Sequence, residues 1–107
     1  ICIYEDWHVR GLDPLTLTRP AADLICGLDT LAQKQTRFFA AGSAGHICRP
    51  NVADLIRSRD PLCPVNDATW LSSAPTVLVN ARWVPARLAS APVNAFADGP
   101  HVGTVNG

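Results

Sequence analysis

A short segment near the amino terminus combines two hydroxyls and a guanidinium between two prolines. It is the run Pro14-Leu15-Thr16-Leu17-Thr18-Arg19-Pro20. Proline restricts its own backbone and that of the preceding residue, so an extended, stiff loop is expected. In an extended segment Thr16 and Thr18 share one face and Arg19 lies on the other. Hydroxyls and a guanidinium presented in this way are suited to phosphate oxygens, two of which a guanidinium can bind at once.

Two acids, Glu5 and Asp6, directly follow the apolar run Ile1–Tyr4. We read this run as a buried strand, and ligands of open α/β sheets bind at the carboxyl ends of strands. Acids at this place are suited to Mg²⁺ or to a sugar hydroxyl. The alternatives are a solvated pair of charges, or a structural ion pair of Arg19 with Glu5, Asp6 or Asp23.

A second buried run, Thr76–Val79, is followed by Asn80 and Arg82. Its β-branched, uncharged residues predict a strand. At its carboxyl end, Asn80 is placed to bind a base or a ribose and Arg82 to bind a phosphate. The alternative is a strand end capped by Asn80, with Trp83 packed on the core.

Arg49 lies where a predicted strand, residues 44–48, meets a predicted helix that begins with Pro50. Helix N-termini attract anions, and proline is favoured in the first helical turn. Arg49 is therefore predicted to contribute to an anion site, and the alternative is an exposed arginine at a helix entry.

The elements that would position these residues alternate along the chain. We predict buried central strands at 1–4 and 76–79, a strand at 44–48, helices at 28–39 and from Pro50, mostly loop at 7–20 and 62–75, and a hairpin joining 93–97 to 101–105. Alternating strands and helices predict an α/β layered fold, and the late hairpin predicts a mixed sheet.

Composition excludes several classes of function. The formal net charge is zero and the basic residues form no run, which disfavours nucleic-acid binding. There is no apolar run long enough to span a membrane, and neither a G-x-G-x-x-G motif nor a P-loop is present. The four cysteines form no C-x-x-C pair, so we expect reduced, buried thiols, with a disulfide framework as the alternative.

These segments, in this order, resemble a bacterial family of sugar nucleotidyltransferases linked to the synthesis of UDP-N-acetylglucosamine. In that family an N-terminal transferase domain precedes a left-handed β-helix. The resembling segments are 3–6 (IYED), 12–24 (LDPLTLTRPAADL), 27–31 (GLDTL), 48–50 (CRP), 77–85 (VLVNARWVP) and the predicted hairpin at 96–105.

The resemblance implies a three-layer α/β/α Rossmann-like fold, of which residues 1–107 form the N-terminal part. It implies transfer of a nucleotidyl group from an NTP, with UTP expected, to a sugar 1-phosphate such as N-acetylglucosamine 1-phosphate, with release of pyrophosphate. It further implies Mg²⁺, a cytoplasmic location in cell-envelope biosynthesis, no nucleic-acid or membrane partner, and homo-oligomers formed through a β-helix outside this chain.

The chain departs from the wider superfamily at two phosphate-binding positions. Gly11 stands where a Gly-rich loop would supply arginine, and Ala21 stands where a lysine would follow Pro20. The neighbouring Arg10 and Arg19 are expected to substitute, with Arg19 in the catalytic role. The expected substrate-binding residues are Glu5, Asp6, Arg10, Thr16, Thr18, Arg49, Asn80 and Arg82. The alternative functions are a non-catalytic nucleotide-sugar-binding or regulatory domain and an inactive fragment.

Overall fold

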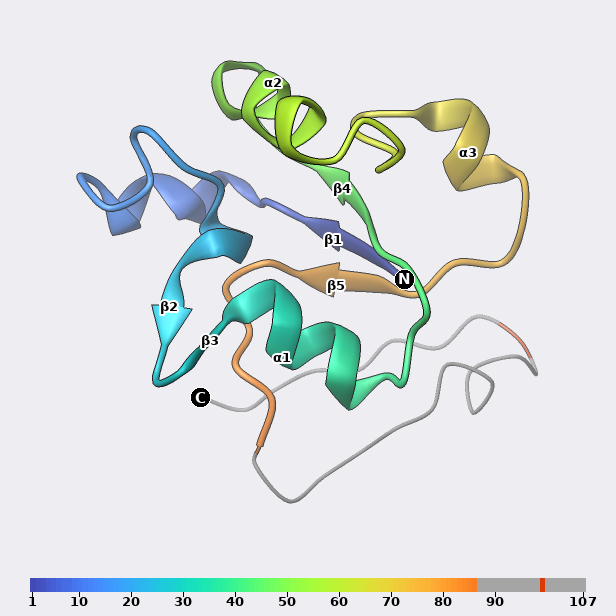
Figure 1. The fold of residues 1–107 in the computed structure, drawn as a ribbon, viewed down its shortest axis with the longest axis horizontal. Coiled ribbons are helices and arrows are strands. Elements are labelled where there is room, and N and C mark those ends of the chain that lie inside the picture. Colours follow the sequence, from blue (N-terminus) through green and yellow to red (C-terminus); the bar gives the residue numbers. More distant parts are fainter. Residues whose placement is uncertain (87–98, 100–107) are drawn as a thin grey trace.

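A computed structural model of the chain describes residues 1–86 and Gly99, and its centre is a three-stranded parallel sheet (Figure 1). The strands lie in the order β4-β1-β5 and comprise Gly45–Ile47, Cys2–Tyr4 and Leu78–Asn80 respectively. The register places Ile3 opposite both His46 and Val79. All of the pairing in this sheet is parallel, as expected for strands joined by helical connections.

The two predicted central strands differ in their positions. β1 is central and buried, with Cys2 and Ile3 each 1% exposed, which confirms that prediction. The prediction for the second strand was wrong, because β5 lies at an edge of the sheet formed by the described residues and Leu78 is 55% exposed. Its alternate residue Val79 is only 4% exposed. An uncharged β-branched run predicts that one face of a strand is buried, but it does not indicate whether the strand lies at the edge or in the centre of its sheet.

The first helix is shorter than predicted. α1 comprises Leu31–Phe38, and its N-cap is Thr30, whose side chain accepts a hydrogen bond from the backbone of Gln33 in a capping box. The residues before it form an antiparallel hairpin of β2 (Ile25–Cys26) and β3 (Asp29–Thr30). Gly27 has φ +76° in its turn, and Leu28 is fully exposed there rather than helical. The predicted helix start was therefore wrong by about one turn.

The second helix agrees with its prediction. α2 comprises Pro50–Arg59, with Pro50 in the first turn and Val52 and Ile56 buried. A short helix that was not predicted, α3 (Ala68–Ser72), follows in the segment expected to be loop. Its N-cap is Asp67, which accepts a hydrogen bond from the Trp70 backbone at 2.9 Å. The segment after β1 also contains a 3₁₀ helix, η1 (Trp7–Leu12), and a second one, η2 (Ala21–Asp23), precedes β2.

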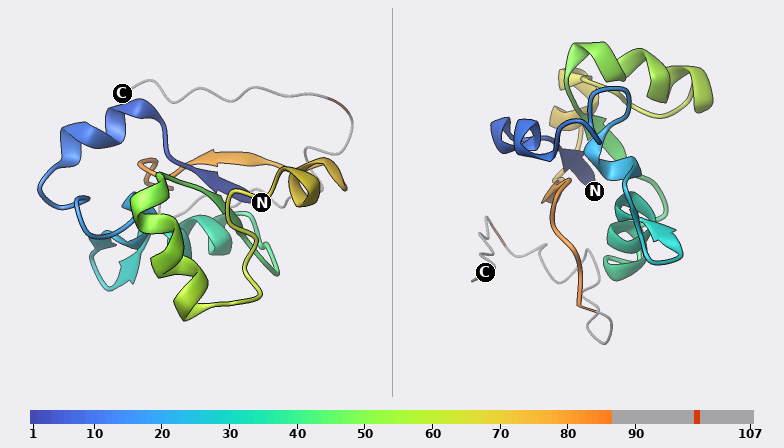
Figure 2. Two further views of the ribbon diagram at one scale, coloured as in Figure 1. Left: turned by 90° about the horizontal axis from the view of Figure 1, so that it is seen from above. Right: turned by 90° about the vertical axis from the view of Figure 1, so that its left-hand side faces the viewer.

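The elements pack as an α/β fold, which confirms the predicted class. α1 and the β2–β3 hairpin lie on one side of the sheet (Figure 2). One core cluster comprises Ile3, Val9, Ala21, Ala22 and Ala81, and another, which joins α2 to β4, comprises Cys48, Val52, Ala53, Ile56 and Val65. The predicted hairpin at 93–105, on which the mixed sheet rested, lies outside the described residues apart from Gly99.

All four cysteines are free thiols, and Cys2 and Cys48 are buried. Burial raises the pKa of the Cys48 thiol to about 11. The prediction of reduced thiols is thus confirmed in the structure, although Cys26 and Cys63 are only half-buried. In the described part of the chain, none of the helices has the length and apolar character needed to cross a membrane.

Candidate active site

The carboxyl ends of the three parallel strands meet at one edge of the sheet, toward which the arrows in Figure 1 point. Glu5 and Asp6 follow β1, Arg49 follows β4, and β5 ends at Asn80 with Arg82 just beyond it. The structure therefore gathers these five predicted site residues at the edge where α/β proteins bind ligands.

Glu5 has both carboxylate oxygens occupied by the protein itself. Oε1 accepts a hydrogen bond from the backbone of Ala21 (2.8 Å), and Oε2 accepts from the backbone (3.1 Å) and Nε (3.0 Å) of Arg49. The Glu5 side chain is 3% exposed. It joins the end of β1 to the start of α2 and to the segment after Pro20, which is a positioning role.

Arg49 is committed to the same internal network. Its Nη2 donates to the carbonyl oxygen of Thr16 at 2.7 Å and lies 3.4 Å from that of Arg19. The guanidinium expected at a bound anion thus holds the 14–20 loop against the sheet edge. Arg49 does not present a free positive charge to an anion, because the Glu5 carboxylate already neutralises its guanidinium.

Thr16 lies inside the loop rather than on its surface. Its side chain is fully buried, and its hydroxyl donates to Oδ1 of Asp13 (2.8 Å) and lies 3.2 Å from the carbonyl oxygen of Val9. Thr18, expected on the same face, is exposed. The segment folds through backbone turns instead of running straight, so the expected alternation of faces was wrong.

Asp6 forms a second internal network with the residues after β5. Its Oδ1 accepts from Nε of Arg82 at 2.9 Å, and its Oδ2 accepts from Nη2 of Arg82 and from Nδ2 of Asn80 (2.9 Å). These bonds hold the pKa of Asp6 well below its usual range, with the Arg82 guanidinium as the main cause. Asp6 and Arg82 thus neutralise each other in a bidentate pair.

Gln35 supports this network from α1, and sequence reasoning missed it. The side chain is fully buried, and its Nε2 donates to the carbonyl oxygens of Asn80 (2.9 Å) and Trp83 (2.7 Å). These bonds tie α1 to the turn that carries Arg82. The only sequence signal is a polar residue at a position that matches the apolar stripe of the helix predicted at 28–39.

The arginines of the described part divide into two groups. Five form ion pairs, namely Arg37 with Asp29, Arg49 with Glu5, Arg57 with Asp54, Arg59 with Asp23, and Arg82 with Asp6. Within the described residues, the guanidinium groups of Arg10 and Arg19 make neither a hydrogen bond nor an ion pair, and both residues are exposed. Both belong to the segment between β1 and η2.

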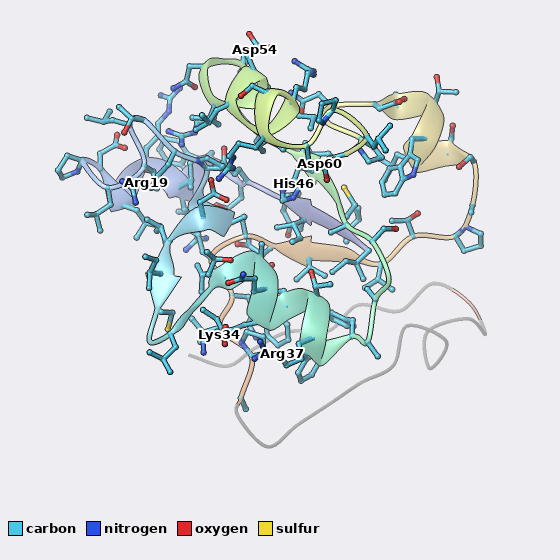
Figure 3. All side chains as sticks on the ribbon, in the orientation of Figure 1. Arg19, Lys34, Arg37, His46, Asp54 and Asp60 are labelled. Carbon is cyan, nitrogen blue, oxygen red and sulfur yellow. The ribbon has the colours of Figure 1, made fainter. Side chains whose placement is uncertain are left out.

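The alternative in which Arg19 forms a structural ion pair was wrong. Each of its three candidate acids is bound by another arginine, as the pairs above show. Arg19 instead lies on the side of the molecule where the strands end (Figure 3). Its guanidinium is therefore available to a ligand.

A hollow of about 350 Å³ opens at the ends of β1 and β4. Its lining comprises Glu5, Asp6, Trp7, Val9, Arg10, Ile47, Cys48 and Arg49. A larger open groove of about 940 Å³ lies between α1, β4 and α2, where His46 and Asp60 line it (Figure 3). None of the predicted site residues lines that groove, so the smaller hollow is the better candidate for the reacting groups.

The described residues do not fit a dedicated magnesium site. Mg²⁺ prefers carboxylate oxygens and water, but the oxygens of Glu5 and Asp6 are already bound by protein donors. No group of three or more His, Cys, Asp or Glu side chains within residues 1–86 is arranged to hold a metal ion.

A parallel sheet with helical connections, and with polar residues gathered at its carboxyl edge, places the molecule among the open α/β domains. The chain matches the family model described as "Sugar nucleotidyl transferase" over residues 1–103, and it belongs to that family. Membership supports a general function in nucleotidyl transfer. Comparisons with curated proteins and with solved structures found no match.

Proposed function

We propose that the protein transfers a uridylyl group from UTP to a sugar 1-phosphate such as N-acetylglucosamine 1-phosphate and releases pyrophosphate. Family membership supports nucleotidyl transfer, and the choice of uridine and of this sugar rests on the resemblance described above. The observation that carries the proposal is the position of Arg10 and Arg19. They are the arginines of the described part with unengaged guanidinium groups, and both lie in the segment between β1 and η2, which begins at the sheet edge.

The reaction asks the protein for positioning and charge stabilisation. An oxygen of the sugar phosphate forms a bond to the α-phosphorus of UTP, the bond from that phosphorus to the β-phosphate oxygen breaks, and pyrophosphate leaves. Negative charge develops on the α-phosphate and on the leaving group. Arg19 and Arg10 would bind these oxygens, and the exposed hydroxyl of Thr18 lies beside Arg19 in the chain.

The two internal networks have a supporting part in this proposal. Glu5 and Arg49 hold the loop that carries Arg19, since Arg49 bonds to two of its carbonyl oxygens. Asp6 and Arg82 fix the neighbouring strand ends to each other. Mg²⁺ would be bound by the phosphates of the nucleotide, a common mode for this ion.

The test is release of pyrophosphate by the full chain. We expect release that requires both UTP and N-acetylglucosamine 1-phosphate in the presence of Mg²⁺. ATP, CTP and GTP, and glucose 1-phosphate in place of the amino sugar, serve as comparison substrates. Equal rates of pyrophosphate release with all four nucleotides would contradict the uridine assignment. If no combination of nucleotide and sugar phosphate leads to pyrophosphate release, the catalytic function is contradicted.

A non-catalytic nucleotide-sugar-binding domain is the second candidate. It is favoured because Arg49 and Arg82, two expected phosphate ligands, are neutralised by internal acids, and because Ala21 stands where a lysine was expected. Calorimetric binding of UDP-N-acetylglucosamine without turnover of UTP would support it. The cytoplasmic location and an oligomer formed through a β-helix remain predictions from the resemblance.

A further inference from the structure

The 3₁₀ helix η1 presents different residues to the hydrophobic core and to the hollow. A 3₁₀ helix has three residues per turn, so residues three apart lie on the same face. Val9 belongs to the buried core, where it also borders the hollow, and Leu12 packs against that core. Trp7 and Arg10 share a different face, and both line the hollow at the ends of β1 and β4. Because Trp7 and Arg10 are three residues apart, the aromatic ring and the guanidinium lie on the same side of the hollow.

Trp7 is unusually accessible for an aromatic residue of this size. It is 72% exposed, and its ring lies 5.6 Å from that of its neighbour His8 at a tilt of 57°. Trp83, by contrast, packs edge-on against Phe38 at 5.0 Å. An exposed indole beside a hollow offers a flat face of the kind on which planar rings stack.

The charges around the hollow favour an anionic ligand. Its two acids, Glu5 and Asp6, are each paired with an arginine, so neither presents an uncompensated negative charge. Arg10 contributes a guanidinium that is unengaged within the described residues. The volume of about 350 Å³ is near the lower end of the range for small-molecule pockets, which suits one part of a nucleotide rather than a whole sugar nucleotide.

We infer that Trp7 is the stacking platform for the nucleobase and that Arg10 binds a phosphate of the same nucleotide. This inference rests on the proposed function, because it requires a nucleotide as substrate. It adds to that function the residue that binds the base. The base would contact the aromatic ring of Trp7 and a phosphate would contact the guanidinium of Arg10, both on one face of η1.

The test uses the tryptophan emission of the full chain, excited at the red edge of tryptophan absorption, together with calorimetry. UTP and uridine should quench the emission, whereas tripolyphosphate should bind without quenching it. Trp7→Ala should remove the quench and weaken UTP binding about tenfold, while leaving tripolyphosphate affinity unchanged. Arg10→Ala should show the opposite pattern, with weakened tripolyphosphate and preserved quenching by uridine.

Two control variants guard against misfolding and general surface effects. Trp7→Tyr retains an aromatic face and should restore most of the UTP affinity. Leu62→Ala changes a 93% exposed apolar residue that does not line the hollow, and it should leave UTP affinity unchanged. Because Trp7 is exposed, the melting temperature of Trp7→Ala should match that of the wild type.

Three outcomes would overturn the inference. If Trp7→Ala binds UTP as the wild type does and still releases pyrophosphate, the base lies elsewhere and only the inference fails. If N-acetylglucosamine 1-phosphate quenches the emission and uridine does not, the hollow holds the sugar. If the wild type neither binds UTP nor releases pyrophosphate, the proposed function fails together with the inference.

Discussion

Glu5 at the end of β1 and Arg49 at the start of α2 form a largely buried ion pair, with Oε2 and Nε 3.0 Å apart. The side chains are 3% and 21% exposed. The same arginine bonds to the carbonyl oxygens of Thr16 and Arg19. Glu5 thus fixes the position of the 14–20 loop indirectly, by orienting the side chain of Arg49.

Replacing Glu5 should be strongly destabilising. Glu5→Gln leaves the Arg49 cation without its counter-charge, and breaking a buried pair in this way costs about 3–5 kcal/mol. Urea unfolding of the variant should show this loss in the free energy of unfolding. Asp54→Asn is the matched control, because Asp54 is 90% exposed and pairs with Arg57 at the surface, so a loss below about 1 kcal/mol is expected. Similar losses in both variants would argue against a special role of Glu5.

Replacing Arg19 should affect kinetics without affecting stability. The Arg19 side chain is exposed and bonds to no described residue. If it stabilises charge in the transition state, Arg19→Ala should cost about 2–4 kcal/mol in kcat/KM, and Arg19→Lys should recover part of this. Leu17→Ala changes an exposed neighbour and should leave kcat/KM near the wild-type value. A lowered melting temperature of Arg19→Ala with unchanged kcat/KM would instead assign it a structural role.

The meeting of Glu5, Asp6, Arg49 and Asn80 at one edge could be predicted, because the carboxyl ends of parallel strands share an edge. Which arginine pairs with which acid could not be predicted, since pairing depends on distances between segments remote in sequence. The role of Gln35 was hidden for the same reason, because its partners are backbone oxygens after β5.

The misplaced start of α1 has a local cause. Leu28 fits an apolar helical stripe, but the positive φ of Gly27 directs the chain into a hairpin turn, and Thr30 provides the actual cap. α3 was missed because five residues are too few to show a helical period. Its signal was the N-cap Asp67 alone.

The Asp6–Arg82 pair should make stability depend on pH. The pKa of Asp6 is lowered in the folded protein, so the pair's contribution is complete above the unfolded pKa of about 4 and is lost as pH falls toward the folded value. Asp6→Asn lacks this contribution at every pH. The difference in unfolding free energy between wild type and variant should therefore be largest at neutral pH and shrink in acid. A difference that is constant with pH would contradict the pair's contribution.

Adding a methyl group at Gly45 should be destabilising. A Cβ atom there would overlap the ring of Trp70, which α3 places over β4. Overpacking of this kind costs about 1–3 kcal/mol, measurable by thermal or urea unfolding. Gly42→Ala is the control, since nothing lies within 4 Å of the added atom. The cost of Gly45→Ala should fall in a Trp70→Ala background, and an undiminished cost would point to a different cause.

The central position of β1 in the sheet has a consequence for folding during synthesis. Of the three strands in the described parallel sheet, β1 is synthesised before both of its partners, and Cys2 lies opposite Gly45 on one side and opposite Leu78 on the other. Until Asn80 has left the exit tunnel, one edge of β1 keeps unpaired backbone groups. During that interval the buried strand β1 is open to pairing with segments other than β4 and β5, so incorrect pairing is most favoured before β5 is available.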